Sequence, residues 1–154
     1  MPTPYTKLYE YLLPKFTDYD LPLISEEDIK EYLKDYISPA ISQFHTCAKN
    51  LFLRDDEREQ FEQELDEIEI QIISNYMLIS YVHANYIITP TLLKVNVSSA
   101  DFHTFSNANH LDKLLALYNQ MVSDNEGLLV KYSWHRPNAE AINQLKSGYR
   151  KRTE

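Results

Sequence analysis

The side chains best suited to hold a metal ion are five histidines and a single cysteine. They are His45, His83, His103, His110, His135 and Cys47. His45 and Cys47 are two positions apart, which on a helix points them to different faces, and neither H-E-x-x-H nor C-x-x-C occurs. The spacing therefore predicts no metal site, and we expect Cys47 to be a small buried apolar side chain.

Residues suited to nucleophilic catalysis are also present, but not in a catalytic pattern. Asp101, His103 and Ser106 have the residue types of a catalytic triad, yet triads are assembled in space and not from sequence neighbours. The chain has only 2 glycines, Gly127 and Gly148, so it contains no glycine-rich phosphate loop and no G-x-S-x-G turn. We therefore expect a protein that is not an enzyme, binds no cofactor and acts through its surfaces.

The charge of the chain is unevenly distributed. Of the net charge of −8, residues 131–154 carry six basic side chains against two acidic ones, a net +4, which leaves −12 for residues 1–130. Residues 54–69 hold nine acidic side chains against Arg54 and Arg58. An acidic body disfavours ordinary duplex binding, because that binding depends on neutralising phosphates.

The C-terminal residues 133–154 are predicted to form a docking arm. Helical periodicity ends near Trp134 and gives way to a polar stretch that ends in the basic run K-S-G-Y-R-K-R at 146–152. Aromatic and arginine side chains dominate interface hot spots. The expected docking residues are Trp134, Arg136, Ile142, Leu145, Tyr149, Arg150, Lys151 and Arg152.

The rest of the chain is predicted to be helical. Residues 1–24 combine four prolines with an amphipathic spacing, which indicates a short helix followed by an extended arm. Ser25 and Asp28 form a capping-box pattern that begins the first firm helix, and Ser38-Pro39 interrupts it. The acidic stretch 54–64 is expected to join two helices.

Two further helices complete the predicted fold. Asp66 is an N-cap candidate with Glu69 three residues on, and it precedes a widely apolar helix over about 68–86 that should be central. Residues 111–132 have the spacing of a last long helix, which Gly127 weakens by about 1 kcal/mol relative to alanine. The fold class is thus all-α: a small helical bundle over 25–132, with an N-terminal arm over 1–24 and a C-terminal arm. No signal peptide or membrane span is expected.

Several stretches of this chain resemble head-to-tail connector proteins of tailed bacteriophages. They are L-I-S-E-E-D-I-K-E-Y-L, Y-I-S-P-A-I at 36–41, the charged linker, I-S-N-Y-M-L-I-S-Y-V, and D-F-H-T-F-S-N-A-N-H-L-D-K-L-L-A-L-Y at 101–118. The most specific element is D-F-x-x-[FY]-S-x-A-N-x-L at 101–111. The resemblance covers roughly residues 21–132.

The resemblance implies a virion protein located at the neck and made in the host cytoplasm. Subunits of such connectors form a ring, commonly twelvefold, below the portal protein, and their C-terminal segments dock on neighbouring virion proteins such as tail or head-closure proteins. DNA passes through the ring without specific binding. The resemblance further implies that an acidic stretch faces this DNA path, here Asp55, Asp56, Glu57, Glu59, Glu62 and Glu64.

Two other classes of function stay open. One is a small helical regulatory or protein-interaction module of a phage that forms no ring. The other is an enzyme of unrecognised type. The oligomeric state discriminates between the connector and the regulatory module, since a ring fits a connector and a monomer or dimer fits a regulator. Some connectors, however, stay monomeric until they meet the portal.

Overall fold

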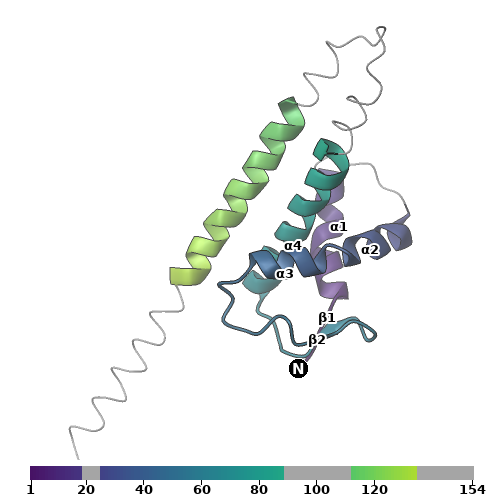
Figure 1. Cartoon of the computed structure of the whole chain (residues 1–154), viewed down its shortest axis with the longest axis vertical. Coiled ribbons are helices and arrows are strands. Elements are labelled where there is room, and N and C mark those ends of the chain that lie inside the picture. Colours follow the sequence, from purple (N-terminus) through teal and green to yellow (C-terminus); the bar gives the residue numbers. More distant parts are fainter. Residues whose placement is uncertain (19–24, 89–111, 135–154) are drawn as a thin grey trace, which may run out of the picture.

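The computed structural model describes residues 1–18, 25–88 and 112–134 (Figure 1). The described chain is mostly helical, as predicted, with very little strand. Its elements are β1 (Thr3–Pro4), α1 (Thr6–Asp18), α2 (Glu26–Lys34), α3 (Ile37–Gln43), β2 (Arg54–Asp55), β3 (Gln60–Phe61), α4 (Glu67–Val82), the π-helical turn η1 (His83–Ile88) and a helix over residues 112–134.

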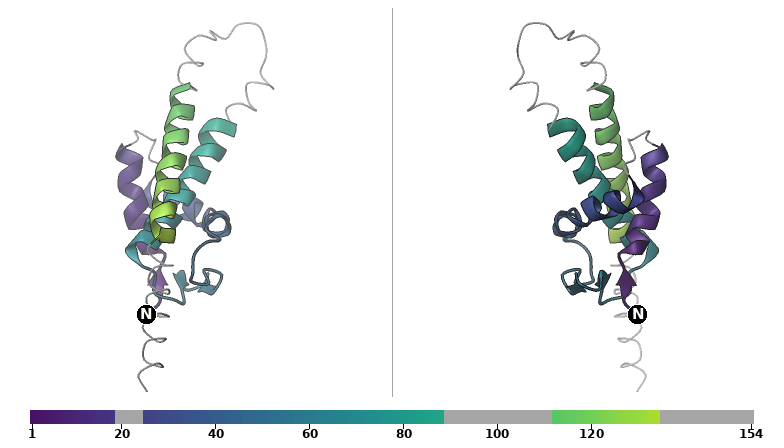
Figure 2. Two further views of the ribbon diagram at one scale, coloured as in Figure 1. Left: turned by 90° about the vertical axis from the view of Figure 1, so that its left-hand side faces the viewer. Right: turned by 90° about the vertical axis from the view of Figure 1, so that its right-hand side faces the viewer.

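Helix α4 lies at the centre of the bundle, as its wide apolar surface predicts. It packs against α1 and α3, and the 112–134 helix lies along it in the antiparallel direction (Figures 1 and 2). Seven of its apolar side chains are buried: Ile72, Ile73, Met77, Leu78, Ile79, Tyr81 and Val82. Because apolar residues cover more than one face, this helix is stable only between several neighbours.

The helix starts agree with the capping patterns of the sequence. Asp66 and Glu69 form a reciprocal capping box at the start of α4, and the Ser25 side chain accepts a hydrogen bond from the Asp28 N–H at the start of α2. The predicted break in the first firm helix is present, but it falls between Lys34 and Ile37 and not at Ser38-Pro39. Pro39 lies in the first turn of α3. Backbone N–H groups in that turn have no acceptor within the helix, so a proline there removes no helical hydrogen bond.

The short helix expected near the N-terminus is present, but it packs into the bundle and does not belong to an arm. Residues 6–18 form α1, and Tyr5, Leu8, Leu12 and Phe16 are fully buried in the core. Burying each of these side chains stabilises the fold by roughly 1.5–3 kcal/mol. Their sum exceeds the cost of one proline inside a helix, about 3 kcal/mol, which here applies to Pro14. The helix was expected, but the prolines led us to assign it to an arm outside the bundle. Residues 19–24, the rest of the expected arm, lie outside the described residues.

The acidic stretch is also more ordered than a linker. Strands β2 and β3 pair antiparallel, and β1 pairs with the other edge of β3, so the order is β1-β3-β2. The Asp55 carboxylate accepts hydrogen bonds from the N–H groups of Glu57 and Arg58 within the turn. Phe61 is 1% exposed and packs edge-on against the Tyr5 ring. One buried aromatic ring thus attaches a charged hairpin to the bundle.

The last helix continues through residue 134, two residues beyond its predicted end. The D-F-x-x-[FY]-S-x-A-N-x-L motif at 101–111 lies outside the described residues. Within the part of the chain that the structure describes, no helix has both the length and the apolar character needed to cross a bilayer.

Candidate functional site

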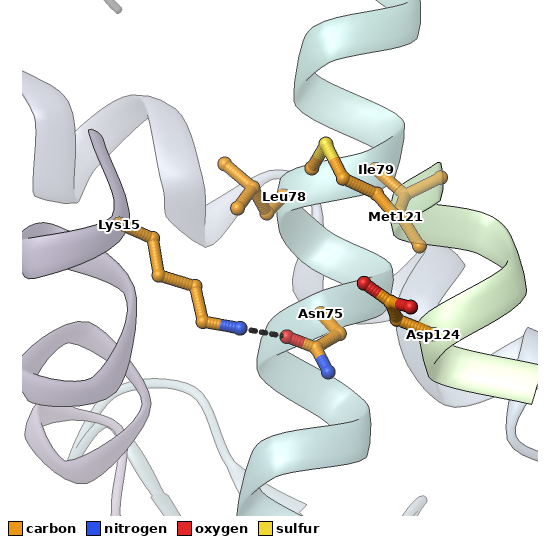
Figure 3. A pocket seen from close by; sticks show the side chains of 6 residues that line it. All are labelled: Lys15, Asn75, Leu78, Ile79, Met121 and Asp124. Carbon is orange, nitrogen blue, oxygen red and sulfur yellow. Dashed lines mark hydrogen bonds between the residues drawn. The ribbon is translucent and has the colours of Figure 1, made fainter. Parts of the chain in front are cut away.

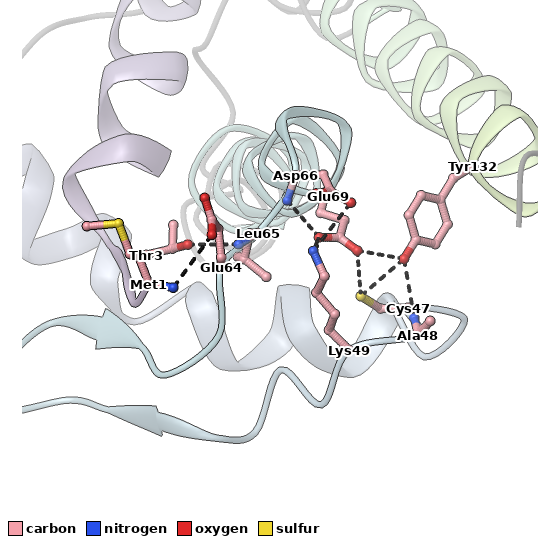
Figure 4. Close-up of polar contacts among 10 residues, drawn as sticks. All are labelled: Met1, Thr3, Cys47, Ala48, Lys49, Glu64, Leu65, Asp66, Glu69 and Tyr132. Carbon is pink, nitrogen blue, oxygen red and sulfur yellow. Dashed lines mark hydrogen bonds and ion pairs between the residues drawn. The ribbon is translucent and has the colours of Figure 1, made fainter.

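A buried carboxylate joins three parts of the fold at the start of α4 (Figure 4). Glu69 has no exposed side-chain surface. Its Oε2 accepts hydrogen bonds from Lys49 Nζ at 2.7 Å and from the Asp66 N–H at 2.8 Å. Its Oε1 accepts a hydrogen bond from the Tyr132 hydroxyl at 2.7 Å. The loop after α3, helix α4 and the end of the 112–134 helix therefore meet at one side chain.

The electrostatics of this cluster favour a structural role. A buried carboxylate is costly unless it is paired and hydrogen-bonded, and both oxygens of Glu69 have such partners. Burial raises the pKa of Tyr132 far above its ordinary value of 10.0, and the hydrogen bond to Glu69 raises it further. Burial lowers the pKa of Lys49, but hydrogen bonds and charges from Glu69 and Asp66 outweigh it, so the net shift is upward. The ammonium and the phenol thus keep their protons.

Cys47 lies at the edge of the same cluster. Its Sγ is 3.8 Å from Glu69 Oε1 and 3.6 Å from the Tyr132 hydroxyl. The side chain is only partly buried. The expectation of a buried apolar cysteine holds in part: Cys47 packs against the core, but its thiol lies beside polar groups.

A second polar cluster lies between α1, α4 and the 112–134 helix (Figure 3). Lys15 Nζ donates a hydrogen bond to Asn75 Oδ1, and Asn75 Nδ2 donates to Asn125 Oδ1 at 3.1 Å. A lysine ammonium can only donate, so it orients the Asn75 amide, which in turn orients the Asn125 amide. Asn125 Nδ2 is left buried without a hydrogen-bond partner among the described residues. A cavity of about 50 Å³ beside this cluster is lined by Lys15, Asn75, Leu78, Ile79, Met121 and Asp124 (Figure 3).

The predicted acidic stretch is placed mainly on the surface of the β2–β3 hairpin. Asp56, Glu57, Glu59, Glu62 and Glu64 are exposed, and Asp55 is partly buried. Four of the six form ion pairs: Asp55 with Arg58, Asp56 with Arg54, Glu59 with Lys34, and Glu64 with the N-terminal amine. The hydrogen bond from the Tyr5 hydroxyl lowers the pKa of Asp56, and Arg54 lowers it further. Glu57 and Glu62 remain as exposed charges beside these pairs.

Of the predicted docking residues, only Trp134 is described. Its side chain is 70% exposed at the end of the 112–134 helix, and Val130, one turn earlier, is 55% exposed. Arg136, Ile142, Leu145, Tyr149, Arg150, Lys151 and Arg152 lie outside the described residues, as do His103, His110 and His135. Among the residues that are described, no group of three or more histidines, cysteines or carboxylates is placed to hold a metal ion.

The two buried polar clusters were missed as sites by the sequence analysis. Glu69 was identified only as a capping residue, and Lys49 and Tyr132 are 20 and 63 positions away from it. The available signal was a polar residue inside an apolar stripe, which applies to Asn75 and Asn125. Which two such residues meet depends on how the helices pack.

Comparisons with protein-family models, with curated proteins and with solved structures find no match to this chain. A functional proposal for it therefore depends on the sequence resemblance and on the surfaces described above.

Proposed function

We propose that this chain is a non-enzymatic virion protein, a subunit of a ring-shaped head-to-tail connector below the portal that forms part of the DNA passage. Its partners in this proposal are further copies of itself, the portal protein, and a tail or head-closure protein, with no membrane contact. Its place is the neck of the virion, after synthesis in the host cytoplasm. The sequence resemblance at 101–118 and the mostly helical fold support this proposal.

The observation that carries the proposal is the incomplete burial of the 112–134 helix. Only Met121, Asn125 and Tyr132 are buried along its described length. Val130 and Trp134 are exposed on one face, and Gly127 lies on the same face one turn before Val130. A Cβ added at Gly127 would meet nothing within 4 Å, so nothing inside the described subunit requires glycine there. A neighbouring subunit that approaches closely would account for all three residues.

The hairpin charges support passage of DNA without binding. Glu57 and Glu62 are exposed acidic side chains on the β2–β3 hairpin, and acidic surfaces repel phosphates where basic ones attract them. A surface of this kind along a tunnel would let the duplex slide, because no phosphate contact has to be broken.

The test is incorporation into phage particles. Mass spectrometry of purified particles should find the chain in stoichiometric amounts, and antibody labelling should place it at the neck. Trp134→Ser should reduce incorporation strongly, because it removes the largest exposed apolar side chain of the helix. Phe52→Ser is the matched control, since Phe52 is an aromatic residue of similar exposure, 68%, in the loop before β2. Complete particles that lack the chain would exclude the connector and favour the regulatory module.

A further inference from the structure

The core of the bundle is nearly complete without the 112–134 helix. Of the 24 buried apolar side chains in the described chain, 22 belong to residues 5–87, and Met121 and Tyr132 belong to this helix. Five more of its apolar side chains pack against the core but are only partly buried: Leu117, Tyr118, Val122, Leu128 and Leu129. Apolar burial is the main favourable term in folding. The helix therefore contributes little to the stability of the elements that precede it.

Hydrogen bonds at two places attach this helix to the bundle. In its middle, Asn125 Oδ1 accepts from Asn75 Nδ2 at 3.1 Å. Near its end, the Tyr132 hydroxyl donates to Glu69 at 2.7 Å and accepts from the Ala48 N–H at 3.3 Å. Each such bond adds only modest net stability, because water replaces the partner when the groups separate. The attachment is thus directional, but it depends on few contacts.

We infer that the 112–134 helix opens as a unit while the bundle of α1, α3 and α4 stays folded. Parts of a protein with few buried apolar contacts open at a lower free energy than its core. Once released, the helix would also lose its backbone hydrogen bonds, since helices in proteins owe most of their stability to packing and Gly127 weakens this one further. Opening uncovers Glu69, Asn75 and Ile79 on α4, which are buried in the closed form. This face of α4 is therefore accessible only in the open form.

The test is native-state amide hydrogen exchange of the full-length protein, followed residue by residue by NMR. We expect the central amides of the 112–134 helix to share one protection factor, at least tenfold below that of the most protected amides of α4. Fraying would instead give protection that rises steadily from the helix ends to its middle. Such a gradient, or a helix as well protected as α4, would overturn the inference.

A substitution in the core distinguishes this opening from global unfolding. Ile29 is 1% exposed and belongs to α2, which lies away from the 112–134 helix (Figure 1). Ile29→Val removes one buried methyl group, so exchange in α4 should become roughly two- to tenfold faster. Exchange in the 112–134 helix should stay unchanged, because the open and closed forms share the same core. Equal acceleration in both helices would show that the last helix leaves only when the whole protein unfolds, which contradicts the inference.

Tyr132→Phe tests whether the contact with Glu69 holds the helix closed. Losing a hydrogen bond to a charged group should speed exchange roughly tenfold along the whole 112–134 helix, including the turn around Met121. Tyr118→Phe is the matched control, because it removes a hydroxyl from the same helix and keeps the ring beside His83. It should leave the exchange rates unchanged. Equal effects of the two variants, or a change confined to the last turn, would contradict the inference.

This opening belongs to the single subunit, so a regulatory module would have it as well as a connector. Hydrogen exchange in the isolated protein does not depend on incorporation into particles. Failure of this inference therefore leaves the connector proposal to be judged separately.

Discussion

Lys15 determines the direction of the hydrogen bonds that cross from α1 to the 112–134 helix. Its ammonium group can only donate, so the amides of Asn75 and Asn125 must both turn their oxygens toward α1. The sequence did not predict this arrangement, because Lys15 and Asn75 are 60 positions apart. By contrast, the contact between Asp66 and Glu69 was predictable, because its partners are three positions apart and their spacing alone specifies a capping box.

Lys15→Met tests the importance of this donor. The substitution keeps the aliphatic stem but leaves the buried Asn75 Oδ1 without its donor, so we expect a loss of about 1–3 kcal/mol in the free energy of unfolding. Urea denaturation measures this loss. Lys7→Met is the matched control, because Lys7 is an exposed lysine of the same helix. Equal stability of the two variants would show that Asn75 finds another donor.

At the scale of elements, apolar periodicity was the reliable signal and proline content was not. Helix α4 was predicted from its length and its apolar residues, and it occupies the central position that these residues favour. Helix α1 has the same kind of signal at Leu8, Leu12 and Phe16, and a short helix was expected there, yet its prolines led us to assign it to an arm outside the bundle. The short strands β2 and β3 were missed because pairing over two residues leaves no periodic pattern to detect.

Ile73→Asp tests the central position of α4. Ile73 is fully buried, so the aspartate would have no water and no prepared partner, and we expect a destabilisation of roughly 3 kcal/mol or more. Ile88→Asp is the control, because Ile88 is 41% exposed at the end of η1 and should tolerate the charge. Thermal unfolding followed by circular dichroism compares the two. A melting temperature for Ile73→Asp close to that of the unchanged protein would place α4 at the surface.

At the scale of the whole molecule, the chain combines an acidic body with many partly buried tyrosines. The sequence contains 12 tyrosines, whose rings are suited to half-buried positions. It did not show which hydroxyls lose water on folding, since that depends on packing between distant segments. Burial raises the pKa of Tyr5, Tyr9, Tyr76, Tyr86 and Tyr132, and nearby charges or hydrogen bonds raise it further in each case.

These shifts predict that the fold loses stability in alkali. The pKa of Tyr9 and Tyr86 rises from 10.0 to about 12, and that of Tyr132 rises further. Above pH 10 the unfolded chain releases phenolic protons that the folded chain retains, so deprotonation favours the unfolded state. The stability due to these hydroxyls is therefore complete below about pH 10 and is lost as the pH rises through the folded pKa values. Each such tyrosine lowers the free energy of unfolding by up to about 1.4 kcal/mol per pH unit in that window.

Urea denaturation at a series of pH values from 8 to 12 measures the slope, and near-ultraviolet absorbance of tyrosinate shows whether ionisation accompanies unfolding. Tyr132→Phe should be less stable near neutral pH, because it removes the hydroxyl that donates to Glu69, but its stability should fall less steeply above pH 10. Tyr32→Phe, at a side chain that is 57% exposed, should reproduce the slope of the unchanged protein. Lys34 and Lys49 also have raised pKa values and act in the same direction above 10.5. Comparing the two phenylalanine variants therefore isolates the part of the slope that belongs to Tyr132. Identical slopes for the two variants would show that the Tyr132 hydroxyl ionises as freely in the folded chain as in the unfolded one.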